Sequence, residues 1–207
     1  MATAGNLVFQ GDALGYFSAY HADTGEKLWT HNNYVTMLAP PISYQIEGKQ
    51  YIAILAGAGA NIVNFFGTRD ADLPALKYGN FGKLFVYSLD GKTEVTRPAE
   101  IDRAIPQPPP LTASADQLIR GEQLYNKVCG ACHGGGVISS GVLPDLRMMS
   151  ASTHDAFEAI VLGGMLSNNG MASFADVLSA NEAELIRQFV ISQALKAREE
   201  APSDIGG

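Results

Sequence analysis

The chain contains very little cysteine: Cys129 and Cys132 are the only two among its 207 residues. Two cysteines this close in sequence cannot staple a fold, which excludes a disulfide-stabilised scaffold. Clusters of lysine and arginine are also missing, and the formal net charge is −7. These absences argue against nucleic acid or an anionic membrane surface as the main partner.

Long apolar runs are missing too. The longest, from Tyr51 to Ala60, is broken by Gly57 and Gly59 and is shorter than the ~18–20 residues that a membrane span needs. We therefore expect no transmembrane segment. Met1–Ala4 has neither the charged nor the apolar region of a signal peptide, so we expect any export signal to lie outside this stretch.

Proline is concentrated in one place. Five of the ten prolines fall between residues 98 and 110, and proline-rich segments favour extended, semi-rigid spacers. We predict a linker over residues 96–111, between domains at 1–95 and 112–200, with a flexible tail at 201–207. Residues 111–207 carry six basic and eleven acidic side chains, so the second part is the more acidic one.

The first part has the pattern of short strands. Aromatic or β-branched runs alternate with Gly-Asp, Thr-Gly, Glu-Gly and Asp-Gly pairs, as hairpin-linked strands require. No strong helical period occurs before residue 111. The six predicted strands are Asn6–Phe9, Tyr16–His21, Lys27–Thr30, Ile42–Gln45, Tyr51–Ala56 and Lys83–Leu89.

The second part has helical periods. Ser114 is placed to cap a helix that ends near Cys129, and Ser179 with Glu182 forms a capping box for a helix that ends near Arg198. A short helix is expected over residues 153–162. An all-α domain of about 90 residues has a small core and needs an additional stabilising element.

Cys129, Cys132 and His133 form the C-x-x-C-H pattern of c-type haem attachment. Two thiols three residues apart can add to the two vinyl groups of a porphyrin, and the adjacent histidine can then bind the iron. The cysteines are thus predicted as haem thioethers and His133 as an axial ligand.

Three alternatives for this pattern remain. A zinc half-site needs a second pair of ligands, and the other histidines are scattered along the chain. A thioredoxin-like pair usually opens a helix after a strand, whereas this pair closes a helix. The third alternative is a chance match in a loop. The scattered histidines are His21, His31 and His154.

A low-spin electron carrier needs a sixth iron ligand, and a methionine thioether raises the potential relative to a second imidazole. Met148, Met149, Met165 and Met171 lie downstream of the motif, and methionines often merely fill gaps in a core. We favour Met171 because a tight polar turn at residues 168–170 precedes it. Met165 is the second choice.

Several motifs together resemble a small mono-haem cytochrome c over residues 112–198. They are Gly121-x-x-x-Tyr125, Cys129-x-x-Cys132-His133, Leu143-Pro144-Asp145-Leu146, Gly170-Met171-x-Ser173-Phe174 and Leu185-Ile186-x-x-Phe189-Val190.

The resemblance to cytochromes c has structural implications. Gly121 and Tyr125 of the first helix would cross Phe189 of the last, where a small residue permits close approach. The carbonyl of Pro144 would accept a hydrogen bond from His133 and so fix its ring. Arg147 would either meet a haem propionate or stand in solvent.

The first part resembles the propellers of pyrroloquinoline quinone (PQQ) dehydrogenases. Ala19-x-His21-x-x-Thr24-Gly25-x-x-x-Trp29 is similar to their tryptophan-docking motif, with His21 where the family usually has aspartate. In that family the tryptophan packs between neighbouring blades. The segments at 39–44 and 48–53 also look like the last blades of those enzymes.

Together the two parts resemble the C-terminal part of a PQQ-dependent quinohaemoprotein alcohol dehydrogenase. The implied fold is multidomain β + α: an incomplete β-propeller of about 1.5–2 blades, followed by an all-α class I cytochrome c domain. The implied cofactors are haem c and, in the full-length parent, PQQ and Ca2+, whose binding residues lie mostly outside this chain. We assign no catalytic residue. His31–Asn33 is expected on a loop near the quinone.

We therefore expect periplasmic electron transfer from reduced PQQ to the haem, with the missing propeller portion and a downstream redox acceptor as partners. The chain alone is not expected to oxidise alcohol, because six strands cannot close a propeller. The alternative is a non-enzymatic electron carrier that docks on another redox protein. A propeller-like interaction protein without a redox role is a third class.

Overall fold

The computed structural model describes residues 1–59 and 73–200. The chain divides into two units, one of Met1–Asp102 with Ser140–Val142 and one of Arg103–Ser139 with Leu143–Gly207. The division after Asp102 falls within the segment 96–111 that we expected to be a linker. The expected tail at 201–207 lies outside the described residues.

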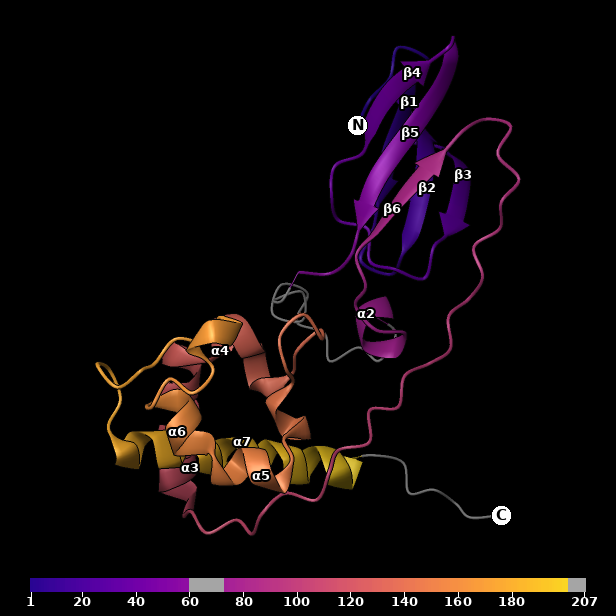
Figure 1. Cartoon of the computed structure of the whole chain (residues 1–207). Helices are drawn as coiled ribbons and strands as arrows, with labels where there is room; N and C mark the ends of the chain where they lie inside the picture. Colours follow the sequence, from indigo (N-terminus) through magenta and orange to yellow (C-terminus); the bar gives the residue numbers. More distant parts are fainter. Residues whose placement is uncertain (60–72, 201–207) are drawn as a thin grey trace, which may run out of the picture. The chain divides into compact units, whose positions relative to one another are not determined.

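Over its described residues, 1–59 and 73–102, the first unit contains two antiparallel three-stranded sheets, each in the order of the sequence (Figure 1). The strands agree with the six predicted runs, and their ends differ by a few residues. They are β1 Leu7–Gly11, β2 Tyr16–His21, β3 Lys27–Asn32, β4 Ile42–Ile46, β5 Lys49–Ala56 and β6 Lys83–Tyr87.

Both sheets contribute to one core. Phe17 of β2 is fully buried and belongs to the same apolar cluster as Ile52 and Ile54 of β5. Trp29 of β3 meets Phe17 and Tyr87 edge-on, with ring centroids 6.1 and 5.6 Å apart. Trp29 nevertheless remains 39% exposed, because it lies on an edge strand.

The second sheet has an apolar outer face. The pairing of Ile42 with Ala53, of Ala53 with Val86 and of Leu55 with Leu84 places these side chains on one side of the sheet. Tyr44 and Tyr51 stack there at 5.4 Å. We call this the outer sheet face; five of its apolar side chains are 48–64% exposed, namely Ile42, Ile46, Leu55, Leu84 and Val86.

The loop expected at residues 31–33 is wrong for its first two residues. A helix, α2 Pro74–Lys77, also occurs before residue 111; it has four residues, too few to produce the helical period whose absence we noted. His31 and Asn32 are not on a loop, because they end strand β3. Asn33, the next residue, is fully buried and accepts a hydrogen bond of 2.6 Å from Tyr87 Oη.

The second unit is helical, as predicted (Figure 1). The expected single helix at 153–162 is instead two short helices, since the chain leaves helical geometry at Ala156. The α-helices are α3 Ala115–Val128, α4 Gly130–His133, α5 Ala151–Asp155, α6 Phe157–Val161 and α7 Ala180–Glu200. The 3-10 turns are η1 Gly135–Val137, η2 Leu146–Met148 and η3 Ser167–Asn169.

Both predicted helix starts are capped. Ser114 and Gln117 form a capping box at α3. At α7, Glu182 N donates to Ser179 Oγ at 3.3 Å, and Ser179 N donates to the Glu182 carboxylate at 3.1 Å. Each box satisfies backbone amides that the first helical turn leaves without partners.

Helices α3 and α7 cross at a glycine. A Cβ atom on Gly121 would lie 2.3 Å from the carbonyl oxygen of Leu185, so no larger residue fits without movement. The rings of Tyr125 and Phe189 meet beside this point, 5.4 Å apart. The crossing implied by the resemblance is therefore confirmed. None of the helices within residues 1–59 and 73–200 is both long and apolar enough to cross a membrane.

Candidate functional site

The C-x-x-C-H segment lies at the junction of two helices. Cys129 caps the C-terminus of α3, and its amide donates to Tyr125 O at 2.7 Å. The turn continues as α4, where the amide of His133 donates to Cys129 O at 2.9 Å. Both cysteines and the histidine therefore belong to one tight helical turn, with Cys129 buried and Cys132 exposed.

The environment of Cys129 disfavours thiolate chemistry. Burial, and then the neighbouring Cys132, raises the pKa of the Cys129 thiol to about 11. Redox-active cysteine pairs require the opposite, a thiol whose pKa is lowered towards neutrality. Among the described residues, no group of three or more His, Cys, Asp and Glu side chains is arranged to hold a metal ion.

His133 is held in one tautomer. Its buried ring places Nδ1 2.9 Å from the carbonyl oxygen of Pro144. A carbonyl can only accept, so we assign a proton to Nδ1; in the neutral imidazole, Nε2 is then the unprotonated nitrogen. A neutral imidazole fixed in this way is a suitable haem-iron ligand, and the donor set of this turn therefore fits a covalent haem.

The backbone directly after His133 requires glycine. Gly134 has φ +84°, and a Cβ atom there would lie 1.9 Å from Ile138 O. The hydroxyl of Tyr125 donates to Gly134 O at 2.8 Å. Burial raises the pKa of Tyr125 far above its usual range, so this hydroxyl remains a donor. His133 is thus fixed by the backbone on one side and by Pro144 on the other.

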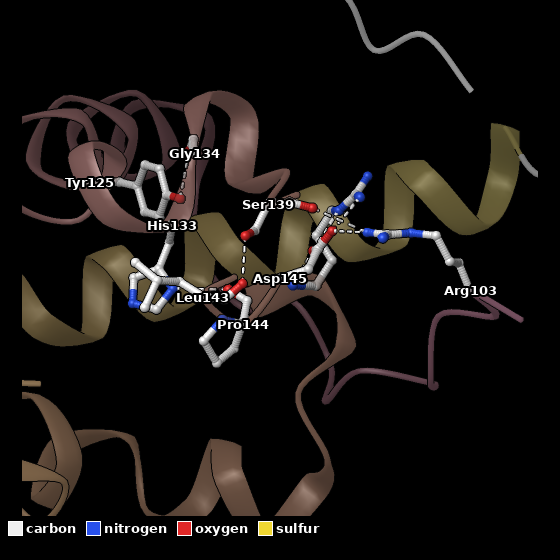
Figure 2. A network of polar contacts seen from close by, with 9 residues as sticks. Arg103, Tyr125, His133, Gly134, Ser139, Leu143, Pro144 and Asp145 are labelled. Atoms are coloured by element: carbon white, nitrogen blue, oxygen red, sulfur yellow. Dashed lines mark hydrogen bonds and ion pairs between the residues drawn. The ribbon is translucent and has the colours of Figure 1, made fainter. Parts of the chain in front are cut away.

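The loop that carries Pro144 is fixed by polar contacts (Figure 2). Ser139 Oγ donates to Leu143 O, and the Asp145 carboxylate accepts from both Arg147 and Arg103. The side chain of Arg147 is only 15% exposed and pairs with Asp145 at 2.7 Å. The expectation that Arg147 stands in solvent is therefore wrong, because this ion pair holds it.

Sequence reasoning missed Arg103 and the role of Asp145. Asp145 belongs to the Leu143–Leu146 motif, but its spacing gives no sign of a partner. Arg103 lies 42 residues earlier, inside the proline-rich segment. No local pattern connects the two residues, so only the tertiary structure identifies this pair.

The two candidate methionines differ in their surroundings. Met171 is partly buried and packs against the apolar core that contains Cys129. It follows Gly170, whose φ of +91° ends the turn η3. Met165 is 61% exposed. Of the two candidate methionines, Met171 is thus the more buried.

Matches to two protein families cover separate parts of the chain. Residues 116–190 match the family described as cytochrome c oxidase, cbb3-type, subunit III. Residues 1–52 match the β-propeller domain of glucose, ethanol and alcohol dehydrogenases. The fold and the motifs thus define a propeller segment joined to a cytochrome c domain.

Individual relatives combine both parts. Quinohaemoprotein alcohol dehydrogenase ADH IIB of Pseudomonas putida is 42% identical over 93% of this chain. The dehydrogenase subunit of the quinone-dependent alcohol dehydrogenase of Gluconobacter oxydans is 35% identical over 96% of this chain. The chain spans only 28% and 27% of the lengths of these two relatives.

Solved structures give the same result. The quinohaemoprotein alcohol dehydrogenase ADHIIG of Pseudomonas putida matches 97% of this chain with a TM-score of 0.80 and 35% identity. The enzyme of Comamonas testosteroni matches 95% with a TM-score of 0.68 and 28% identity. The resemblance to quinohaemoprotein alcohol dehydrogenases is therefore confirmed, with this chain corresponding to a little over a quarter of such an enzyme.

Proposed function

We propose that this chain transfers electrons through a covalently bound c-type haem. Cys129 and Cys132 would hold the haem through thioether bonds, and His133 and Met171 would bind the iron. One observation carries the proposal. His133, which lies on the same helical turn as both cysteines, has its Nδ1 2.9 Å from Pro144 O, within hydrogen-bond distance. When bound, the haem supplies reversible one-electron chemistry.

The protein's own residues set the properties of the proposed ligands. The Pro144 carbonyl orients the imidazole of His133 and increases its basicity, which makes the ring a stronger donor. Met171 offers a soft thioether, which favours ferrous iron and so a higher potential. The partly buried position of Met171 against the core supports this role.

The source of electrons is proposed from the relatives. Their names pair a quinone with a haem, which supports haem c and PQQ as the cofactors of this family. We propose that the chain is the C-terminal portion of such a dehydrogenase, matured in the periplasm, and that the parent oxidises an alcohol with PQQ and Ca2+. Electrons would then pass through the haem to a downstream acceptor.

The outer sheet face supports a missing propeller portion as a partner. Its five exposed apolar side chains form the kind of surface that adjacent blades bury against each other. Trp29, which the docking motif assigns to a contact between blades, is likewise 39% exposed. A free-standing electron carrier has no need of either feature.

Covalent haem attachment provides the direct test. The chain is expressed in a periplasm that has a cytochrome c maturation system. The purified protein is expected to keep its haem through denaturing gel electrophoresis and to stain for haem peroxidase activity. The double variant Cys129→Ser with Cys132→Ser should lose the stain. A colourless, folded wild-type protein with two free thiols would refute the proposal.

A further inference from the structure

Asp145 is a buried carboxylate with two cationic partners. Its side chain is 4% exposed, and both oxygens accept hydrogen bonds. Arg147 donates from Nε and Nη2 at 2.9 and 2.7 Å, and Arg103 donates from Nη2 at 2.8 Å. A buried charge with this many partners is held in one geometry, because losing any of them leaves the carboxylate poorly satisfied.

The two arginines differ in how far they lie from Asp145 along the sequence. Arg147 is two residues from Asp145, so their pair restrains only the local turn η2. Arg103 comes from a segment 42 residues earlier, and its Nη2 also lies 3.4 Å from Ser139 O. One guanidinium thus contacts both Ser139 and Asp145, the two ends of the loop 139–145 (Figure 2).

Pro144 lies between two restrained neighbours. On one side, the carbonyl of Leu143 accepts from Ser139 Oγ. On the other, Asp145 is held by the two arginines. The Pro144 carbonyl, which accepts the hydrogen bond from His133, therefore depends on these anchors for its position, since Pro144 itself is exposed.

We propose that Arg103, through Asp145, is a positioning residue that holds the Pro144 carbonyl on His133 and thereby sets the potential of the iron. The inference rests on the proposed haem function. It also gives the proline-rich segment a role beyond that of a spacer, since Arg103 belongs to that segment.

Two physical effects predict opposite results for Arg103→Gln. If the side chain acts only as a nearby positive charge, its loss favours ferric iron and the potential falls. If it positions Pro144, its loss weakens the hydrogen bond to His133. The imidazole then becomes a poorer donor, ferrous iron is favoured and the potential rises. The sign of the change therefore separates the two effects.

The experiment uses the haem-loaded full chain and its variants Arg103→Gln, Arg103→Lys and Arg198→Gln. The control residue, Arg198 of α7, also contacts the proline-rich segment, but it donates to Ile105 O rather than to Asp145. Two quantities are measured: the midpoint potential, and the exchange rate of the His133 Nδ1 proton by nuclear magnetic resonance of the ferrous protein.

For Arg103→Gln we expect a raised potential and Nδ1 exchange faster by roughly tenfold, the equivalent of losing about 1.4 kcal/mol of hydrogen bonding. Arg103→Lys should be intermediate and Arg198→Gln unchanged. If Arg103→Gln does not fold, the comparison of Arg103→Lys with Arg198→Gln decides. Unchanged exchange, or a falling potential, overturns the inference. A wild-type chain without covalent haem overturns the proposed function instead.

Discussion

At the scale of single residues, the proposed haem site combines a rigid histidine with a less restrained methionine. His133 is fixed by the Pro144 carbonyl, and the backbone that follows it requires a glycine at Gly134. Met171 follows a short polar turn and is only partly buried. Substitutions of the methionine should therefore change the iron's properties more than the fold.

Met171→Ala is expected to abolish the weak sulfur-to-iron charge-transfer band of the oxidised protein in the far red. It should also lower the midpoint potential, because a soft ligand that favours ferrous iron is lost. Met165→Ala, at a residue that is 61% exposed, is the matched control and should change neither property. Loss of the band in Met165→Ala alone would reverse the assignment.

At the scale of elements, the packing of two helices can reverse the change in stability that helix propensity predicts for a substitution. Gly121 is inside α3, where replacing glycine with alanine normally stabilises a helix by roughly 0.5–1 kcal/mol. At this position, however, the new Cβ would lie 2.3 Å from Leu185 O and 3.1 Å from Phe189 Cβ. The close approach of α7 reverses the expected sign.

Gly121→Ala is therefore expected to lower the free energy of unfolding by about 1–3 kcal/mol, the usual cost of overpacking. Urea denaturation followed by circular dichroism measures it. Glu122→Ala, at the exposed neighbouring position of α3, should stay within about 0.5 kcal/mol of wild type. An increase in stability for Gly121→Ala would show that α3 and α7 do not approach this closely.

The buried His154 of α5 makes stability depend on pH. Burial, and then the positive charge of Arg187 on α7, lowers the pKa of His154 below its usual value, with Asp155 partly opposing this. Within the described residues, neither ring nitrogen has a hydrogen-bond partner. Below pH about 6.5, the His154 side chain therefore binds a proton more readily in the unfolded chain than in the folded one.

The free energy of unfolding should consequently decrease as pH falls below about 6.5, with a slope from this group of at most about 1.4 kcal/mol per pH unit. Above that pH the contribution of His154 is constant. His154→Gln should remove this part of the slope when urea denaturation is compared at pH 7.5 and 5.5. Equal slopes in the two proteins would contradict the assignment.

At the scale of the whole molecule, the two units differ in how completely they bury their apolar surface. The helical unit has a core that includes Leu124, Ile186 and Val190 and both capped helices around it. The strand unit has two small sheets and leaves the outer sheet face uncovered. A closed propeller needs at least four blades of four strands, and the six described strands fall far short of this.

The purified, haem-loaded chain is thus expected to undergo reversible one-electron reduction but to show no alcohol-dependent dye reduction, even with PQQ and calcium added. Voltammetry tests the first expectation and a dye assay the second, with a complete quinohaemoprotein alcohol dehydrogenase as the positive control. Substantial turnover by this chain would mean that several copies together form the quinone site.

Much of this architecture was readable from local sequence. Alternating aromatic and β-branched runs predicted all six strands, because strand formation follows a period of two residues. The Ser179–Glu182 spacing predicted a helix start, and the C-x-x-C-H spacing predicted the candidate haem site, which stays a prediction. The four-residue helix α2 and the break at Ala156 escaped prediction, since elements this short contain no full period.

The sequence by itself determined what depends on neighbours within a few residues: the strands, the capped helices, and the turn that joins Cys129, Cys132 and His133. Only the tertiary structure decided which distant groups meet. It placed Arg103 on Asp145, 42 positions away, buried His154 near Arg187, and left the outer sheet face exposed. The physical reason is that long-range ion pairs and burial depend on how whole elements pack, and no local period records that.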